Sequence, residues 1–387
     1  MSIISRTDRG LLAQWWWTVD RWMLASMLLL IVLGVVLSLA ASPPVAERLG
    51  LSEFHFTIRH VIYAIPAAVV VVATSFLDDR QARRAALVIV ALGFMALMLT
   101  LAYGPEVKGA RRWLDIGPFS IQPSEFVKPA FVILSAWLFA EGMRRPEIPG
   151  NILATALLAM FVTLLVLQPD YGQTVLVAAV WSVMLFMTGI SWLWIGALGV
   201  TGFAGMVVAY LSVSHVARRL DRFLAPGEGD TYQVDMAMEA FARGGLFGRG
   251  PGEGSVKYVL PDAHSDFIFA VVGEEFGILA CLLLAAIFAF VVHRGLARAL
   301  EEWDPFRRIA VAGLTALFGF QALINMAVNV SLLPAKGMTL PFVSYGGSSL
   351  ISVGFAMGLV LALTRRRPRG TAIVPPRSRP ATAAGYA

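Results

Sequence analysis

The sequence has few charged residues for its length and a single cysteine. Charged side chains make up 14% of the 387 residues and hydrophobic ones 58%, whereas about a quarter of residues are charged in soluble domains. This scarcity of charge excludes a large soluble domain and predicts an all-α, polytopic integral membrane protein. Cys281 lies in an apolar run and has no second cysteine to pair with, which excludes a disulfide framework and a thiolate zinc cluster.

Nucleotide and nucleic-acid binding find little support in the sequence. The net charge is +6, but the arginines punctuate the gaps between apolar runs, whereas a nucleic-acid partner requires a clustered basic face. The glycine-rich run 248–254 matches neither the P-loop spacing nor GxGxxG. It therefore predicts a loop, with a pyrophosphate cradle of backbone N–H groups as the alternative.

Apolar segments long enough for transmembrane helices recur along the chain. A helical span consumes about 20 apolar residues, which predicts ten spans, at 22–41, 58–77, 85–103, 124–142, 151–168, 173–190, 192–212, 266–292, 308–333 and 342–363. Lys and Arg are more frequent in the connections on the N-terminal side, so the positive-inside rule predicts that both termini face the cytoplasm.

This reading divides the chain into three parts. We expect an N-terminal tail at 1–20, a single ten-helix membrane domain at 21–364, and a basic, disordered tail at 365–387. A large external loop at 213–265 connects the seventh and eighth spans, and within it residues 231–243 predict a short helix.

The outward connection between the third and fourth spans concentrates positive charge. Lys108, Arg111 and Arg112 precede a span that begins with Glu125 and Lys128. The last two are three residues apart, so they share a helix face and can neutralise each other. The pattern predicts either a structural ion pair or, together with the loop cations, a wall for an anionic substrate.

Two further connections and one span carry unusual polar residues. Gln168 and Asp170 flank a proline in a tight turn, where Asp170 either caps the next helix or faces a ligand. Ser344 and Ser348 lie in the glycine-containing entry to the last span. A polar stripe at i, i+4, i+8 on one helix face predicts interhelical hydrogen bonds, from Gln321, Asn325 and Asn329.

The candidate catalytic residues lie at the start of the eighth span. We expect Asp266 in the first turn of this helix, where the macrodipole favours its ionised form, so it is either a cap or a general base. His264 is the rival base, because its free pKa is close to neutral. Glu274 lies about two turns deeper and must face protein, a cation or a wet cavity.

Five motifs together resemble those of the SEDS proteins (shape, elongation, division and sporulation). They are 109–128 (GARRWLDIGPFSIQPSEFVK), 168–170 (QPD), 232–233 (YQ), 260–270 (LPDAHSDFIFA) and 340–349 (LPFVSYGGSS). The resemblance covers essentially the whole chain between the tails. Ala263 and Lys336-Gly337 are similar to the division-type members, with elongation-type members as the alternative. Asp262 and Ser265 depart conservatively from the family pattern, and 235–242 departs more, which leaves any role of that helix open.

The resemblance implies a ten-helix enzyme that polymerises lipid II into glycan strands on the outer face of the cytoplasmic membrane, at the division septum. It implies that Asp266 takes the proton of the acceptor hydroxyl. Lys108, Arg112 and Lys128 would offset the pyrophosphate charge, with Glu125 orienting Lys128. The expected substrate-binding set is Lys108, Arg111, Arg112, Glu125, Lys128, Gln168, Asp170, His264, Glu274, Ser344 and Ser348.

The resemblance also implies partners. These are lipid II, glycan linked to undecaprenyl pyrophosphate, a class B penicillin-binding protein that cross-links the strands, and other divisome membrane proteins, but no nucleic acid. No cofactor is expected, and the sequence leaves a divalent cation at the pyrophosphate open. A lipid II flippase is the main alternative function, and a non-catalytic scaffold of the division machinery is the third.

Overall fold

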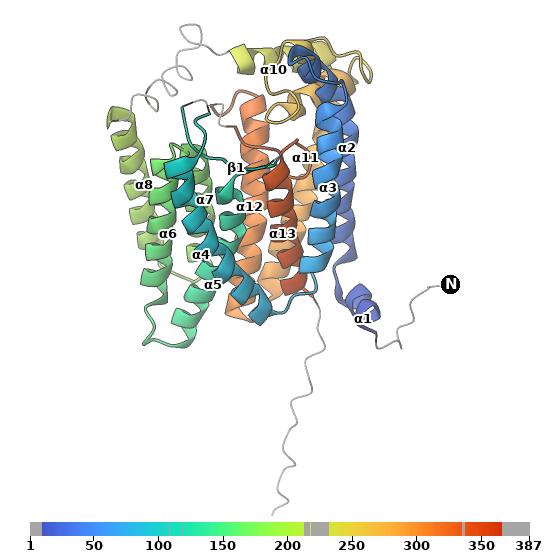
Figure 1. Ribbon diagram of the computed structural model, residues 1–387. Coiled ribbons are helices and arrows are strands. Elements are labelled where there is room, and N and C mark those ends of the chain that lie inside the picture. Colours follow the sequence, from blue (N-terminus) through green and yellow to red (C-terminus); the bar gives the residue numbers. More distant parts are fainter. Residues whose placement is uncertain are drawn as a thin grey trace, which may run out of the picture.

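The computed structural model describes residues 10–107, 109–117, 119–212, 217, 232–334 and 337–365. A helix lies at each of the segments predicted to span the membrane, so the all-helical membrane fold is confirmed (Figure 1). Their bounds are α2 Arg21–Arg48, α3 His55–Thr74, α4 Asp79–Tyr103, α5 Pro123–Arg144, α6 Gly150–Leu167, α7 Tyr171–Phe186, α8 Trp192–Ser212, α11 Ile268–Glu301, α12 Pro305–Asn329 and α13 Gly347–Leu363.

Length and composition suit membrane crossing in most of these helices. Within the described residues, seven of them (α2 to α6, α11 and α12) are long and apolar enough to cross a membrane, while α7 and α13 are apolar but shorter. A helix that is hydrophobic on all sides must be surrounded by lipid or by other helices. The number of spans, ten, and their orientation remain predictions.

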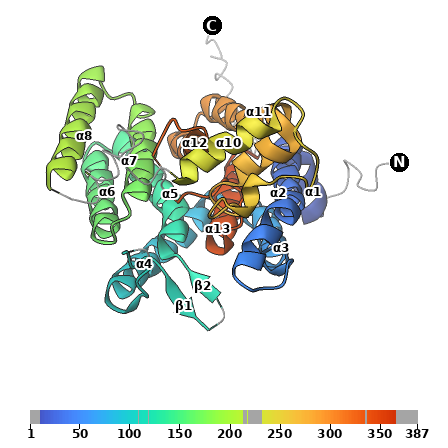
Figure 2. The same ribbon diagram turned by 90° about the horizontal axis from the view of Figure 1, so that it is seen from above.

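The centre of the bundle consists of α5, α12 and α13 (Figure 2). In their most apolar windows α5 is 67% buried and α12 is 72% buried, whereas α3 and α4 are 28% buried. Seen from above, α5, α12 and α13 occupy the middle, with α2 and α3 on one side and α6, α7 and α8 on the other (Figure 2). A Cβ on Gly313 of α12 would lie 2.7 Å from Val132 of α5, so a small residue permits this close packing.

The two ends of the bundle differ in structure. One end carries α10 (Tyr232–Gly244), the short 3-10 helix η1 (Val256–Tyr258) and an antiparallel hairpin of β1 (Leu114–Ile116) and β2 (Phe119–Ile121). The short helix expected at 231–243 is therefore present, while the hairpin is a small departure from an all-helical chain. Helix α1 (Leu11–Thr18) lies at the opposite end (Figure 1).

The eighth predicted span is not one continuous helix. Gly277 has φ 81° and ψ 176°, which breaks α11 near its start. The glycine-rich loop after α10 fills the break, because Arg249 N donates to Glu274 O (3.0 Å) and Ile278 N donates to Gly245 O (2.9 Å). These bonds satisfy backbone groups that a broken helix would leave unpaired in a membrane. The loop is thus built into α11.

Candidate active site at the α10 end of the bundle

Asp266 lies in a turn between η1 and α11, and two asparagines of α12 hold its backbone. Asn325 Nδ2 and Asn329 Nδ2 each donate to the carbonyl oxygen of Asp266 at 2.9 Å. Asn329 Oδ1 also accepts from Ala270 N at 3.1 Å, inside the first turns of α11. The polar stripe of α12 therefore makes the expected interhelical hydrogen bonds, and these bonds fix the position of the aspartate.

The position of Asp266 differs from the expected one. Helix α11 begins at Ile268 with Phe267 as its N-cap residue and with no side-chain cap, so Asp266 is neither in the first helical turn nor the cap. Its side chain is half-buried and lines a cavity of about 20 Å³ together with Gln233 of α10 and Gly337. The carboxylate thus lies beside the helix N-terminus and next to a space, as a general base requires.

Ser344 and Tyr345, from the entry to α13, hold the residues just before Asp266. Ser344 Oγ donates to Ser265 O at 2.5 Å and accepts from Leu340 N at 2.8 Å. Tyr345 N donates to His264 O at 3.1 Å. Ser344, predicted to bind substrate, here has a structural contact with the turn that contains Asp266.

His264 is buried beside the aromatic ring of Phe56, with 4.3 Å between ring centroids. Burial lowers the pKa of His264 to about 4; Asp262 opposes this shift and Arg48 adds to it. The imidazole is therefore neutral at pH 7, and its burial keeps it away from a substrate hydroxyl. Access favours Asp266 over His264 as the base, because Asp266 is half-buried and lines the cavity whereas His264 does not.

Lys128 is at the centre of a buried polar network. Its Nζ donates to Glu125 Oε1 (2.8 Å), Gln173 Oε1 (2.9 Å) and Gln321 Oε1 (3.4 Å), and only 2% of the lysine side chain is exposed. The predicted pair of Glu125 with Lys128 is present. All three ammonium protons have protein acceptors, so Lys128 acts here as a structural cation that joins α5, α7 and α12.

The same network reaches the turn that contains Asp266. Gln321 Nε2 donates to Thr339 O at 3.2 Å, and Asn325 Nδ2 donates to Met338 O at 2.6 Å. Gln321 and Asn325 are one helical turn apart, so α12 ties the segment around 338–339 to both Lys128 and Asp266. Gln173 is a member of this network that was not predicted, although it is the first residue of a predicted span.

Arg112 and Asp170 meet at the turn between α6 and α7. Asp170 caps α7 by accepting from Gln173 N at 3.5 Å, and Arg112 Nε lies 3.8 Å from Asp170 Oδ2. Burial raises the pKa of Asp170, and Arg112 opposes that shift. Arg112 also donates to the carbonyls of Gln168 and Pro169. The predicted capping role of Asp170 is therefore confirmed.

The remaining predicted residues of this region surround that turn. Gln168 Nε2 donates to Leu97 O at 3.1 Å, and Ser348 Oγ accepts from Gln122 N at 3.4 Å. Arg111 is half-exposed and lies 3.9 Å from Glu106. Lys108 lies outside the described residues. Arg111 and Arg112 are the cations in the described part of this connection that keep solvent exposure.

Both carboxylate oxygens of Glu274 accept hydrogen bonds from backbone N–H groups. Its carboxylate accepts from Ser255 N (2.7 Å), Val256 N (2.8 Å) and Lys257 N (3.3 Å), and the residue is fully buried. Glu275 accepts from Lys257 Nζ at 2.5 Å. Glu274 therefore anchors the loop that contains η1 and does not face a substrate space, which corrects the role expected for it.

The glycine-rich loop likewise lacks the alternative role of a pyrophosphate cradle. The backbone N–H of Arg249 donates to Glu274 O, and that of Gly250 donates to Glu275 O. The N–H of Gly252 donates to the Glu275 carboxylate. Among the described residues, no cluster of three His, Cys, Asp or Glu side chains could hold a metal ion.

Comparisons with known proteins agree with this architecture. The sequence model of the family described as "Cell cycle protein", which groups FtsW, RodA and SpoVE, matches residues 20–368. The chain is 48% identical over 366 residues to a "Probable peptidoglycan glycosyltransferase FtsW" of Caulobacter vibrioides, with 94% of each chain covered. It is 36% identical to a protein of the same name from Geobacter metallireducens, covering 90% of this chain and 96% of that one.

Two solved structures share the fold. One, described as "Structural coordination of polymerization and crosslinking by a peptidoglycan synthase complex", matches with TM-score 0.74 and 25% identity and covers 89% of this chain and 97% of that one. The rod shape determining protein RodA of Thermus thermophilus matches with TM-score 0.68 and 27% identity over 91% of this chain and 99% of that one. With a family model that spans nearly all of its membrane helices, the chain belongs to the FtsW, RodA and SpoVE family of cell cycle proteins.

Proposed function

We propose that this protein is a peptidoglycan glycosyltransferase that polymerises lipid II into glycan strands during septal cell-wall synthesis. The names of the relatives support this activity. The observation that carries it is the position of Asp266, whose backbone is clamped by Asn325 and Asn329 and whose carboxylate faces a cavity. A general base needs this combination of fixed position and access.

The reaction takes place at the α10 end of the bundle, which faces the outside of the cytoplasmic membrane. In this orientation the opposite end, which carries Arg21, Arg144, Arg294, Arg298 and Arg307, faces the cytoplasm, as the positive-inside rule requires. Ten spans then place both termini inside the cell. Lipid II that has reached the outer leaflet meets Asp266 directly.

Asp266 removes the proton from the sugar 4-hydroxyl of the incoming lipid II. The freed oxygen attacks the anomeric carbon of the growing strand, and the bond between that carbon and the undecaprenyl pyrophosphate oxygen breaks. The lipid pyrophosphate leaves with the bonding electrons. The neutral His264 packs beside the turn and takes no proton at pH 7, because burial holds its pKa at about 4.

Charge on the leaving group requires cations at the same end of the bundle. Arg111 is exposed beside the hairpin. Arg112 is partly exposed while its guanidinium also binds the turn between α6 and α7, and Lys108 is adjacent in sequence. We assign the pyrophosphate to these three residues, because preorganised cations stabilise developing negative charge. Lys128 acts indirectly, since its ammonium group is saturated by Glu125, Gln173 and Gln321.

A cross-linking partner follows from the fate of the product. The solved complex that shares this fold coordinates polymerisation with crosslinking. We propose that this chain pairs in the same way with a class B penicillin-binding protein, whose transpeptidase domain acts on the new strands, and that both work with other divisome membrane proteins at the septum.

The experiment is a reconstitution of the full chain and its class B partner in liposomes that contain fluorescent lipid II. Glycan strands of increasing length separate on a gel, and accessibility of the fluorophore to a soluble quencher reports transfer between leaflets. Polymer formation without transfer supports the proposal. Transfer of lipid II without polymer, under conditions where the protein remains folded, would favour the flippase.

A further inference from the structure

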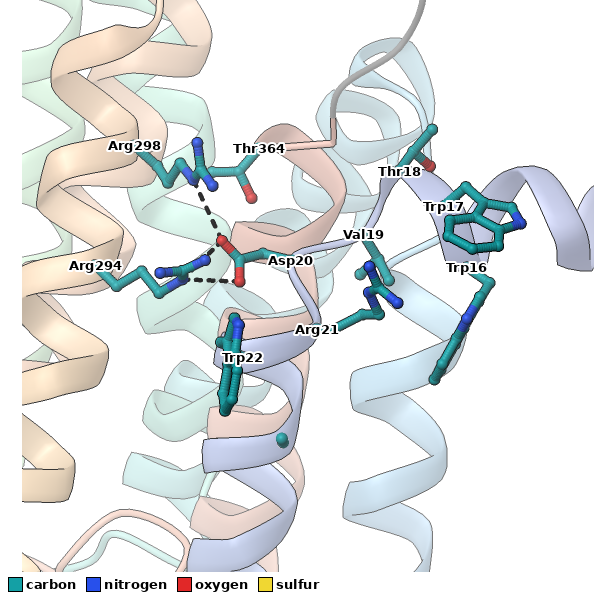
Figure 3. A pocket seen from close by; sticks show the side chains of 11 residues that line it. Trp16, Trp17, Thr18, Val19, Asp20, Arg21, Trp22, Arg294, Arg298 and Thr364 are labelled. Atoms are coloured by element: carbon teal, nitrogen blue, oxygen red, sulfur yellow. Dashed lines mark hydrogen bonds and ion pairs between the residues drawn. The ribbon is translucent and has the colours of Figure 1, made fainter. Parts of the chain in front are cut away.

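A large cavity lies at the end of the bundle opposite α10, far from the proposed active site. It measures about 630 Å³ and lies between α1, the start of α2 and α11 (Figure 3). Trp16, Trp17 and Trp22 contribute aromatic walls, and Arg21 and Arg294 contribute positive charge. Tryptophan favours the headgroup layer of a membrane. The cavity therefore combines aromatic and cationic groups at the depth of lipid headgroups.

One carboxylate organises the floor of this cavity. Asp20 Oδ1 and Oδ2 both accept from Arg294 Nε at 2.8 Å, and Oδ2 accepts from Arg298 Nε at 3.2 Å (Figure 3). Asp20 also caps α2 through Met23 N. Burial alone would raise the pKa of Asp20, but the bonds from Arg294 and Met23 lower it overall. Asp20 is thus a fixed anion that positions two guanidinium groups.

The lining carries more positive than negative charge. Arg21, Arg294 and Arg298 face the cavity, while Asp20 is the one carboxylate among the described residues that line it. Within the described part of the chain, Arg294 donates only through Nε, so its two Nη groups remain available. In the same part of the chain the Arg21 side chain makes only ring contacts. Its Cζ atom lies 5.7 Å from the centroid of the Trp16 ring and 5.4 Å from that of the Trp17 ring. An anionic group would complete this site.

Apolar surface continues from the cavity along the membrane. On α2 the exposed side chains form a stripe that begins at the cavity and runs toward the other end of the helix, with Trp22 (70% exposed), Leu29 (46%), Val32 (57%), Val36 (50%) and Leu39 (49%). A soluble anion would leave this apolar stripe uncovered, whereas the acyl chains of a lipid cover it. On α1, Leu11 and Leu12 are also exposed, as expected of a helix that lies in the membrane interface.

We propose that this cavity binds the headgroup of an anionic phospholipid, with the phosphate on Arg21 and Arg294 and the acyl chains along α2. The arginine-rich end of the bundle supports this occupant, because the cytoplasmic leaflet holds anionic lipids and basic pockets between helices bind their headgroups. The lipid fixes α1 against the ends of α2 and α11, and Trp15 already anchors α1 to the end of α3 by donating to Ser75 Oγ at 2.7 Å.

The test uses the full-length protein in nanodiscs of zwitterionic lipid with increasing mole fractions of brominated phosphatidylglycerol, which quenches nearby tryptophan. Arg294→Gln and Arg21→Gln remove one cation each from the site. Arg84→Gln is the matched control, because Arg84 is exposed in α4 and does not line the cavity. Arg21 has no ion pair in the described structure, so Arg21→Gln preserves the fold even if Arg294→Gln does not.

We expect each cavity variant to require about fivefold more brominated lipid for half-maximal quenching, since one arginine near a membrane surface contributes about that factor. Arg84→Gln stays within about twofold of the wild type, and inorganic phosphate does not restore fluorescence. Equal binding by all variants, or equal loss in Arg84→Gln, would overturn the proposal. Displacement of the lipid by phosphate would show an anion site without lipid specificity and would overturn it as well.

Discussion

Removing the Glu274 carboxylate releases the loop that carries η1. Three backbone N–H groups, from Ser255, Val256 and Lys257, donate to this carboxylate at 2.7 to 3.3 Å. Each buried donor left without a partner costs about 1–3 kcal/mol. Because neighbouring effects are not additive, we expect Glu274→Ala to lower the free energy of unfolding by about 4 kcal/mol. Glu274→Gln keeps one carbonyl oxygen and loses about half as much.

Two readouts measure this effect. A loss of about 4 kcal/mol lowers the unfolding midpoint in detergent by about 4–8 °C for a chain of this size. Trypsin reports the loop directly, since Lys257 is 3% exposed in the native protein and becomes cleavable when the loop opens. Glu253→Ala is the matched control, because Glu253 is exposed in the same loop. If Glu274→Ala unfolds and is cleaved like Glu253→Ala, the anchoring role is refuted.

Three further changes test other parts of the structure. Gly277→Ala places a Cβ 2.3 Å from Leu246 O and should cost more stability than Gly252→Ala, which shares the positive φ but meets no atom within 4 Å; a difference below about 1 kcal/mol would contradict the close contact of Gly277 with the α10 loop. Lys128→Met leaves the buried Glu125 charge unpaired and should cost about 3–5 kcal/mol, much of which the added Glu125→Gln change should restore in the same unfolding assay. The pKa of His264, lowered from 6.5 to about 4, predicts that the unfolded chain binds the extra proton between these values, so stability falls as pH falls from 6.5 toward 4, and His264→Phe should flatten this dependence.

Local spacing predicted much of the fold and part of the site. The helices follow from apolar runs of the required length, and the pair of Glu125 and Lys128 follows from their i, i+3 separation on one helix. The capping by Asp170 follows from its place before a predicted span. These features depend on neighbours within one or two helical turns.

Long-range pairing explains what the sequence did not reveal. Asp20 meets Arg294 across 274 positions of the chain, and Glu274 bonds to a loop 17 to 19 residues before it. No periodicity encodes such partners. The break at Gly277 was also missed, because a single glycine in an apolar helix is tolerated and only its contacts with the α10 loop reveal the positive φ.

The most direct test of the proposed function compares Asp266→Asn with Asp262→Asn in lipid II polymerisation by the protein and its class B partner. Both changes remove one carboxylate from the same turn and keep its shape, and asparagine tolerates the positive φ of Asp262 (53°). We expect Asp266→Asn to make no glycan strands and Asp262→Asn to retain most of the activity. Strand formation by Asp266→Asn at the wild-type rate would contradict the assignment of Asp266 as the general base.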